Sequence, residues 1–586
     1  MTAPDVLVVL PVVGPLLAAA GTLLLRFHLQ AQRVLALAVV AAVAADAAVL
    51  LAAADTGGPT VAHLGDWPAQ IGLTLVADRL AALLLLTSAV VTLAVLGYAV
   101  GQGIVDERAD GNSTIFNACY LTLVAGVALA YLTADLFNLF VAFEVMLVSS
   151  YVLITLGTTA ERVQAGMTYV IVSLTSSLLF LTTLALVYAS TGTVSFVGLA
   201  ATMPSLPAAL RAALGLLVLV VFSIKAAVVP LHFWLPDSYP TAPAPITAVL
   251  AALLTKVGVY AIVRTHTLAF PHRGTWPLLL AAAVATLLVG ALGALAQENL
   301  NRSLSFLLVS HIGFMLFGLS LFTVIGLSGV ILYMVHHIVV QATLFLASGL
   351  ITRYAGTSMP RRTGGLATAV PVVAVLFAIP ALGLSGVPPL SGFIAKLALL
   401  QAGSRAGAAS GPGTGAFRTG VYVAVAAMLV TSLLTLYVMA RVWVSAFWRR
   451  PRPAHPDPEP DDLLVVGTET VSRPMIVATA GLVAVGLAFP VLAGPLSGLT
   501  TRAAADLLAP SVYEHAVLGG EPGRDPVRHG TAGGRGILPA QDLPVGRGAA
   551  RGNGLAIGQA AADRPGSAHG DADADRDAHG DAGGGR

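Results

Sequence analysis

Apolar runs of about 20 residues, separated by short polar stretches, follow one another from the start of the chain to about residue 498. A helix needs about 20 mostly apolar residues to cross the hydrocarbon core of a bilayer. The pattern therefore predicts an all-α polytopic membrane protein with about 14 transmembrane helices. The expected spans are 5–25, 34–54, 76–100, 113–132, 134–157, 164–190, 208–229, 244–266, 276–297, 302–321, 325–351, 371–400, 419–446 and 473–498.

The pattern stops near residue 500, where Gly, Ala, Arg, Asp and Pro become dominant. Such a composition cannot bury enough apolar area to offset the entropy that is lost on ordering. Residues 500–586 are therefore expected to form a disordered tail. At the other end, residues 1–112 are expected to hold the first three transmembrane helices, and 473–498 is expected to be the last one.

Composition agrees with a membrane environment and limits the function. Of the 586 residues, 56% are hydrophobic and 10% are charged, and a soluble protein cannot cover that much apolar surface. The net charge of +2 is too small to favour nucleic acid as a partner. Cys119 is the single cysteine, which excludes an internal disulfide and a Cys-based iron–sulfur site. The sequence has no P-loop, dinucleotide fingerprint or HExxH motif, so we expect no cofactor and no metal.

Basic residues near the helix ends predict the orientation. They are about twice as frequent in one alternating set of loops, which should be cytoplasmic, and an even number of spans then places both termini outside. The richer set holds Arg26, Arg33, Arg108, Arg162, Arg302, Arg353, Arg361, Arg362, Arg449, Arg450 and Arg452. The poorer set holds Arg79, Arg211, Arg264, Arg273, Arg405 and Arg418.

Lysine is distributed differently from arginine. The chain has 31 Lys plus Arg, and its lysines, Lys225, Lys256 and Lys396, all fall within expected spans. Arginine stays protonated in proteins, whereas a buried lysine can release its proton because burial disfavours the ammonium form. A cation in mid-membrane costs roughly 2.5–3.5 kcal/mol on insertion scales, so we interpret these lysines as proton carriers. The alternative is that they snorkel to the interface or form structural ion pairs.

Glu144 is the acid that matches these lysines. It lies about ten residues into the span that is expected to begin near Ala134, close to the middle of the bilayer. A buried carboxyl group is protonated when it has no partner, and a neighbouring lysine favours its ionised form, so a Glu–Lys pair can act as a charge switch. Asp135 begins the same span and is instead expected to stabilise a helix N-terminus.

His336 and His337 are the third feature of the apolar spans. An imidazole titrates near neutral pH and can accept and pass on a proton. Neighbouring residues on a helix point about 100° apart, so one of the two is expected to relay protons and the other to pack, with His337 preferred as the relay. His232 and His311 are weaker candidates, for which we expect hydrogen-bonded roles in the core.

Two of the lysines lie beside proline-rich breaks. Five prolines follow Lys225 between residues 230 and 245, and two adjacent prolines precede Lys396 within residues 386–392. Proline interrupts a helix, and the freed carbonyl groups must find partners in protein or water. Breaks at corresponding places indicate inverted repeats, so residues 113–266 and 276–446 are expected to form two inverted five-helix repeats, each with a Pro-broken fourth helix. The alternative is an ordinary proline kink in a structural helix.

The sequences around these breaks resemble a known family. Residues 221–237 (VFSIKAAVVPLHFWLPD), 242–260 and 385–396 (SGVPPLSGFIAK) are similar to motifs of the antiporter-like subunit family. This family includes the large membrane subunits of Mrp-type sodium/proton antiporters, of respiratory complex I and of membrane-bound hydrogenases. The resemblance extends over about residues 1–500. Residues 143–157 (FEVMLVSSYVLITLG) are most similar to the D subunit of Mrp antiporters.

The resemblance implies fourteen helices, two inverted repeats and two half-channels joined by a central hydrophilic axis. It implies that Glu144 is the acid of the fifth helix and that Lys225 is its partner on the broken seventh. It also implies that Lys256 is a central bridge on the eighth helix and that Lys396 is the terminal lysine on the broken twelfth.

Two positions depart from the family pattern. The eleventh helix of the family often reads His-x-x-x-Lys-x-x-Leu-Phe, whereas this chain has Gln341 at the lysine position after His337. Gln341 cannot titrate, so the relay there would depend on histidine and water. Asn301 precedes Arg302 at a place where lysine is common, and we expect it to be structural.

Together these features predict a proton-translocating subunit of a multisubunit monovalent cation (Na+)/proton antiporter, which is a secondary transporter and no enzyme. Expected partners are a larger paralogous subunit, small membrane subunits, protons, Na+ and lipid, and the expected location is a bacterial-type inner membrane. The first alternative is a proton-pumping membrane subunit of a complex I-like NADH-quinone oxidoreductase or a membrane-bound hydrogenase, to which the term translocase would apply. The second is a non-conducting structural membrane subunit. A stand-alone channel is disfavoured because paired opposite charges suit switching better than continuous conduction.

Overall fold

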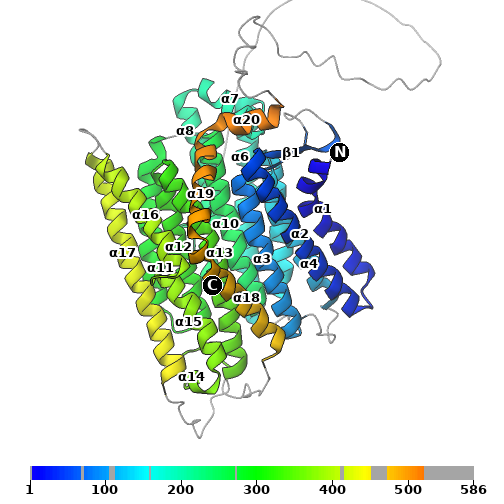
Figure 1. Ribbon diagram of the computed structural model, residues 1–586. Helices are drawn as coiled ribbons and strands as arrows, with labels where there is room; N and C mark the ends of the chain where they lie inside the picture. Colours follow the sequence, from blue (N-terminus) through cyan, green and yellow to red (C-terminus); the bar gives the residue numbers. More distant parts are fainter. Residues whose placement is uncertain are drawn as a thin grey trace, which may run out of the picture. The chain divides into compact units, whose positions relative to one another are not determined.

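The computed structural model describes residues 3–66, 72–104, 113–156, 160–270, 273–409, 415–449 and 471–519. This part is almost entirely helical, and most of its long helices run side by side (Figure 1). Within the described residues, 13 helices are long and apolar enough to cross a membrane. The shorter apolar helix α15 (Pro371–Ser385) and α16 (Ser391–Ala408) fill the place of the remaining expected span. The prediction of an all-α polytopic membrane protein with about 14 spans is confirmed.

The other long helices are α1 (Ala3–Leu24), α2 (Leu29–Gly57), α3 (Arg79–Gln102), α4 (Ser113–Leu132), α5 (Leu136–Thr155), α6 (Ala160–Thr191), α8 (Ala208–Ala226), α10 (Ala244–Arg264), α11 (Trp276–Ala296), α12 (Leu300–Ser320), α13 (Val324–Ala355), α17 (Gly415–Trp443) and α18 (Arg473–Val491). The shorter helices are α7 (Phe196–Thr202), α9 (Trp234–Ser238), α14 (Leu366–Ala369), α19 (Ala493–Leu508) and α20 (Pro510–Leu518). The π-helical turns η4 (Thr265–Ala269) and η6 (Val444–Trp448) extend α10 and α17. Between α2 and α3, strands β1 (Thr60–His63) and β2 (Thr74–Ala77) pair antiparallel, with Thr60 opposite Ala77.

Polar residues in the sequence explain where several helices begin. The side chain of Asp78 accepts a hydrogen bond from Ala81 N (2.8 Å) at the start of α3, and Asp135 accepts one from Asn138 N (2.6 Å) at the start of α5. Each carboxylate satisfies one of the backbone donors that a helix N-terminus leaves free. The helix-capping role predicted for Asp135 is confirmed.

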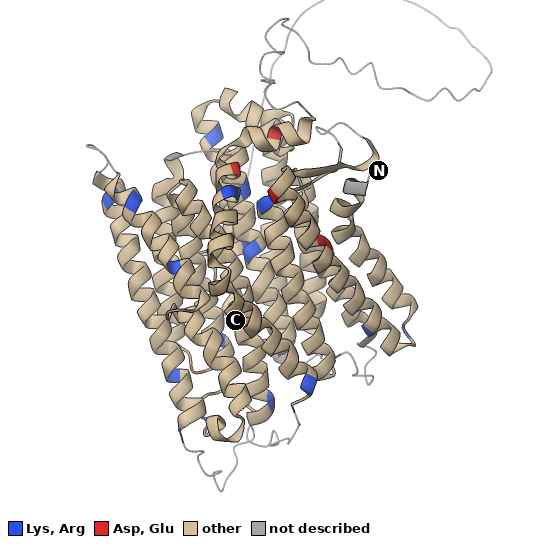
Figure 2. Cartoon of the chain, viewed as in Figure 1, with Lys and Arg blue, Asp and Glu red and all other residues tan. Residues whose placement is uncertain are grey.

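Arginine serves helix ends and the surface in this fold, and charged residues are sparse along the helices (Figure 2). The guanidinium of Arg441 donates to Leu295 O (2.7 Å) and Gln297 O (2.8 Å), carbonyl groups that the end of α11 leaves free. The ion pairs of Arg302 with Asp237 and of Arg361 with Glu298 involve side chains that are about half or more exposed. Such exposed pairs contribute little to stability.

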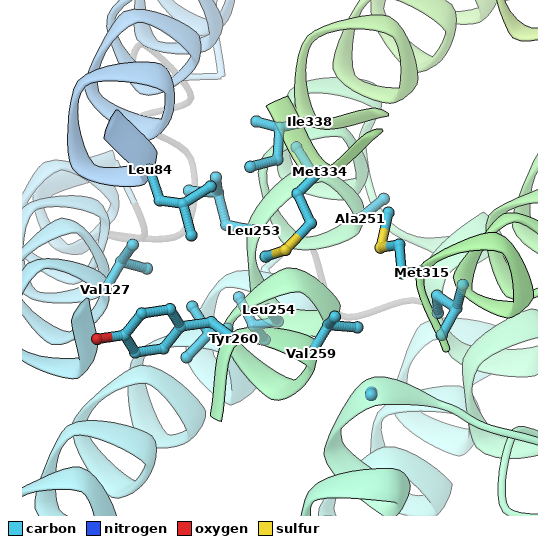
Figure 3. Packing of buried hydrophobic residues seen from close by; sticks show 14 of the residues in the cluster. Leu84, Val127, Ala251, Leu253, Leu254, Val259, Tyr260, Met315, Met334 and Ile338 are labelled. Carbon is cyan, nitrogen blue, oxygen red and sulfur yellow. The ribbon is translucent and has the colours of Figure 1, made fainter. Parts of the chain in front are cut away.

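α10 lies in the interior of the helix bundle. Every residue from Pro245 to Arg264 is buried, and α10 contacts α3, α8, α12 and α13. Figure 3 shows Leu253 of α10 near Leu84 of α3 and Met334 of α13, and Tyr260 of the same helix on the side of Val127 of α4. A helix that is hydrophobic on all sides is stable only in the interior, so the lysine on this helix is kept away from lipid.

The two predicted repeats have matching sets of helix neighbours. In the first, α4 packs on α5, α5 on α6, and α6 on both α8 and α9. In the second, α11 packs on α12, α12 on α13, and α13 on both α15 and α16. The last helices, α10 and α17, contact α8 and α16 respectively. This agreement supports two related halves, although the boundaries 113–266 and 276–446 and the inverted relation stay predictions.

Both proline-rich segments interrupt a helix, as predicted. α8 ends at Ala226 and α9 begins at Trp234, whereas α15 ends at Ser385 and α16 begins at Ser391. Ala227 (φ 59°) and Gly386 (φ 87°) turn the chain out of the preceding helix. A cis peptide bond lies in each break, at Val229–Pro230 and at Pro388–Pro389. The expected span 371–400 is therefore two helices with a break between them.

The helical part extends further than the sequence analysis predicted. α19 and α20 cover the first part of the expected tail, and α19 packs against α3 and α13. Its buried residues recur every three or four positions, at Thr500, Ala503, Ala504 and Leu507. This spacing is the amphipathic signal that the change of composition near residue 500 concealed. Residues 520–586, which hold most of the expected disordered tail, lie outside the described residues.

Candidate functional site: buried lysines and histidines

Lys225 lies in the last turn of α8, directly before the first break. Only 6% of the residue is exposed. Its Nζ donates hydrogen bonds to Ser177 Oγ (3.2 Å) and Ser173 O (3.4 Å) of α6, and it lies 5.7 Å from the centre of the Phe143 ring of α5. The ammonium group therefore faces the interior of the first repeat.

Glu144 is the next residue after Phe143 on α5. Its carboxylate is close enough to interact electrostatically with Lys225, but within the described part of the chain no ion pair of 4.0 Å or less joins the two. Glu144 Oε1 is buried and has no hydrogen-bond partner among the described residues. The structure thus brings the two predicted partners into one region without direct pairing.

A cavity of about 20 Å³ lies beside Lys225. Its lining includes Ser173 and Ser176, and the Oγ atom of Ser176 is buried without a hydrogen-bond partner among the described residues. A cavity of this size holds about one water molecule, and buried polar atoms are the groups that such waters satisfy. Lys225 therefore lies beside a position that can hold one water molecule.

Lys256 is completely buried in the middle of α10, and its Nζ donates a hydrogen bond to Ala251 O (2.7 Å) of the same helix. Gly258, on the same helix, faces the end of α8. A Cβ atom at Gly258 would lie within 3.0 Å of backbone atoms of Ala226 and Lys225. The helices that carry the first two lysines thus approach each other backbone to backbone.

His337 and His311 are stacked in the second repeat. Their ring centres are 5.3 Å apart and their planes differ by 9°. His311 shares hydrogen bonds with Tyr333 Oη (2.7 Å) and Thr435 Oγ1 (3.4 Å), whereas both ring nitrogens of His337 are buried without a hydrogen-bond partner among the described residues. His337 also interacts electrostatically with Lys256 and Lys396. The stacked pair therefore lies within electrostatic range of both the second and the third lysine.

His336 shares Tyr333 as a ring neighbour with His337, but its hydrogen-bond partner is different. Its Nδ1 shares a hydrogen bond of 2.9 Å with Ser391 Oγ, at the start of α16. Its Nε2 is buried without a hydrogen-bond partner in the described part of the chain. The expectation that the two histidines face different ways is met, and which of them relays protons stays a prediction.

Lys396 lies in the second turn of α16 and is 5% exposed. Its Nζ donates hydrogen bonds to Leu384 O (2.9 Å) and Ser385 O (3.0 Å), the carbonyl groups that α15 leaves free at the break. A cation at a helix C-terminus is favoured by these carbonyl groups and by the helix dipole. The broken helix is thus what supplies partners to a buried ammonium group. The Nζ also lies 5.1 Å from the centre of the Phe314 ring.

The structural alternatives for the lysines fit these contacts poorly. A snorkelling lysine keeps its ammonium at the interface, but Lys225, Lys256 and Lys396 are 94% or more buried. A structural ion pair needs an acid within 4.0 Å, and within the described residues these lysines have only carbonyl and hydroxyl partners at hydrogen-bond distance. Neutral partners allow a lysine to exist with or without its extra proton.

Several members of the site were missed or underestimated from sequence. His311 was given only a hydrogen-bonded core role, which it has, but it also stacks on His337. Tyr333 and Ser391 could not be found from sequence, because an isolated hydroxyl in an apolar span carries no spacing signal.

Gln341 donates to Leu304 O (3.1 Å), and its Oε1 is buried without a partner in the described part. His232 lies in the first break, 6.5 Å from the Phe306 ring centre.

The comparisons with known proteins agree with this arrangement. The family described as NADH:quinone oxidoreductase/Mrp antiporter, TM matches residues 133–435, which include every lysine of the site. The fold and its buried titratable groups define a polytopic membrane protein of the antiporter class. The chain belongs to the NADH:quinone oxidoreductase/Mrp antiporter transmembrane family.

The chain is similar to relatives over most of its length. It is 36% identical to the D subunit of the Na(+)/H(+) antiporter of Alkalihalophilus pseudofirmus over 515 residues, which are 87% of this chain and 99% of that protein. A chain in the structure of the Mrp complex from a Dietzia species matches with a TM-score of 0.79 and 32% identity, over 88% of this chain and all of that chain. A chain of a membrane-bound sulfane sulfur reductase, described as an archaeal respiratory membrane complex, matches with a TM-score of 0.75 and 26% identity over 88% of this chain and all of that chain.

Proposed function

We propose that this chain is the proton-translocating, D-type subunit of a multisubunit Na+/proton antiporter in a bacterial cell membrane. The observation that carries the proposal is the series of buried lysines with neutral hydrogen-bond partners, together with the histidines between the last two of them. The similarity to a protein named as the D subunit of a Na(+)/H(+) antiporter supports the same conclusion.

In this proposal a proton moves by successive changes of charge. A proton that reaches Lys225 draws the carboxylate of Glu144 closer, and its departure releases that carboxylate. The charge then passes by Lys256 and the stacked pair His337–His311 to Lys396, where the carbonyl groups at the end of α15 hold the ammonium form. The membrane potential supplies about 2.3 kcal/mol per charge per 100 mV. This is enough to shift the equilibrium between two charge states whose free energies are similar.

The partners belong to the proposal as well. We assign the route of Na+ to other subunits of the complex, which would include a larger paralogous subunit and small membrane subunits. Both termini are proposed to lie on the outer side, following the distribution of arginine in the loops.

The alternative is a proton-pumping subunit of a respiratory complex. It is supported by the likeness to the archaeal respiratory complex, which is weaker than the likeness to the Mrp complex. The same residues would move protons in either case, and only the partners and the driving force differ.

The experiment that separates these functions is affinity purification of the tagged chain in mild detergent, followed by mass spectrometry. The antiporter proposal predicts a larger paralogue and small membrane subunits without redox proteins. Recovery of flavin, iron–sulfur or nickel subunits would replace it with the respiratory alternative.

A further inference from the structure

Glu144 lies within electrostatic range of two groups and is paired with neither. Its carboxylate interacts electrostatically with Lys225 of α8 and with Tyr151 of its own helix, α5. Within the described residues no ion pair joins it to Lys225, and its Oε1 atom is buried without a hydrogen-bond partner. A buried carboxylate without a partner is costly, because it has lost its contacts with water. The position therefore offers this carboxylate a choice between two partners.

Tyr151 is the donor that Glu144 has along α5. The two residues are seven positions apart, so they lie within about 20° of each other around the helix axis and about 10 Å apart along it. Long side chains on a helix lean toward its N-terminus, so the phenol of Tyr151 extends back toward Glu144. Its Oη atom is buried and also has no hydrogen-bond partner among the described residues. An unsatisfied acceptor and an unsatisfied donor thus share one face of α5.

The ring of Tyr151 is held in place by other aromatic residues. It meets the ring of Tyr169 on α6 edge to face, with centres 5.3 Å apart and planes at 78°. Tyr169 in turn packs on Trp234, and its hydroxyl shares a hydrogen bond of 2.7 Å with Ser150 Oγ. The hydroxyl of Tyr169 is therefore engaged, whereas that of Tyr151 has no such partner in the described part of the chain.

We propose that Tyr151 is the second partner of Glu144, and that its hydroxyl donates to the carboxylate when Lys225 has released its proton. The inference rests on the proposed function and deepens it. While Lys225 is charged, its ammonium group attracts the carboxylate. Once Lys225 is neutral, the phenol supplies a hydrogen bond that stabilises the negative charge, and such a bond is strong where water is excluded.

This role makes Tyr151 a positioning residue. The phenol carries no proton along the path, but it determines where the carboxylate of Glu144 lies after each change of charge at Lys225. A neutral donor suits this task, because it stabilises the carboxylate without competing with the returning ammonium group as a second cation would.

Infrared difference spectroscopy of the assembled complex during a pH titration tests the proposal. The carbonyl band of protonated Glu144 is identified as the band that Glu144→Gln removes, and the pH of its half-conversion is compared among variants. Tyr151→Phe keeps the ring against Tyr169 and removes only the hydroxyl. Tyr188→Phe on α6 is the matched control, because it makes the same exchange in a residue that is 58% exposed.

We expect Tyr151→Phe to raise the pH of half-conversion by about one to two units, because a hydrogen bond to the ionised form favours that form. The shift should be larger in a Lys225→Ala background, where the phenol is the only one of the two partners that is left. Packing alone predicts no such dependence on Lys225. Tyr188→Phe should leave the pH of half-conversion unchanged.

Two results would overturn the proposal. One is a Glu144 band that Tyr151→Phe does not move, and the other is a shift that does not grow in the Lys225→Ala background. The spectra need no transport, so the two proposals can fail separately. Unchanged antiport in Lys225 variants would refute the proposed function, whereas an unmoved band would refute only the role of Tyr151.

Discussion

The imidazole ring of His311 on α12 lies parallel to that of His337 on α13, with 5.3 Å between their centres. Both ring nitrogens of His311 form hydrogen bonds, with Tyr333 and Thr435. Both ring nitrogens of His337 lack a hydrogen-bond partner among the described residues. On the proposed path between Lys256 and Lys396, a proton would therefore meet one imidazole that is fixed in orientation, His311, and a neighbouring one, His337, whose nitrogens have no such partner among the described residues.

This stacked pair leads to a prediction about proton transfer. His337→Phe keeps an aromatic ring for the stack but removes both nitrogens. The rate of antiport should then fall at least about tenfold, because a positioned proton-transfer group accelerates proton transfer by at least that factor. The measurement is proton uptake driven by a Na+ gradient in vesicles that hold the complex, normalised to the amount of chain. Antiport at the unmodified rate would show that protons bypass His337.

The close approach of α8 and α10 at Gly258 predicts a packing effect. Gly258→Ala would place a methyl group against the backbone of Ala226 and Lys225, and overpacking of this kind costs about 1–3 kcal/mol. We expect a lower melting temperature of the purified complex together with weaker antiport. The control is Gly97→Ala on α3, where a Cβ atom would meet nothing within 4 Å and stability should be unchanged or slightly higher. A Gly258 variant as stable as the Gly97 variant would contradict the packing described here.

A buried ion pair makes a prediction about stability. Arg264 at the end of α10 holds both carboxylate oxygens of Asp78 (2.6 and 2.9 Å), and the two side chains are 3% and 8% exposed. Removing one partner strands the other charge, so Arg264→Leu should destabilise the complex by about 3–5 kcal/mol. The double variant Arg264→Leu/Asp78→Leu should recover part of this loss, which thermal unfolding of the purified complex would show. No loss in the single variant would mean that Asp78 is solvated or protonated there.

The membrane-spanning pattern and the lysine positions could be predicted from sequence because both depend on local composition. Apolar runs fix the spans, and Lys225, Lys256 and Lys396 stand out in them whatever the tertiary structure. Asp135 could be assigned to a helix start for the same reason, since a cap acts within one turn.

What the sequence could not provide depends on contacts between distant segments. The stacking of His311 on His337 joins two helices, and the end of α15 becomes a site only because Lys396 of the next helix reaches its carbonyl groups. The second half of α19 falls in the expected tail because its small and polar residues resemble the sequence that follows. Its order comes from packing on α3 and α13 and from the pairing of Arg502 with Asp55.

The central claim is that Lys225 carries a proton and does more than supply a fixed positive charge. Lys225→Arg retains the charge and much of the length of the side chain, but a guanidinium does not release its proton in a protein. Arg211→Lys is the matched control, because it exchanges the same two residue types in the first turn of the same helix, away from the site.

The most direct test is Na+-driven proton antiport in vesicles that contain the complex with Lys225→Arg, Lys225→Ala or Arg211→Lys, at equal amounts of assembled complex. The account predicts loss of antiport in both Lys225 variants and unchanged antiport in the Arg211 variant. Full antiport with Lys225→Arg would show that a permanent charge suffices at this position and would contradict the proton-carrying role.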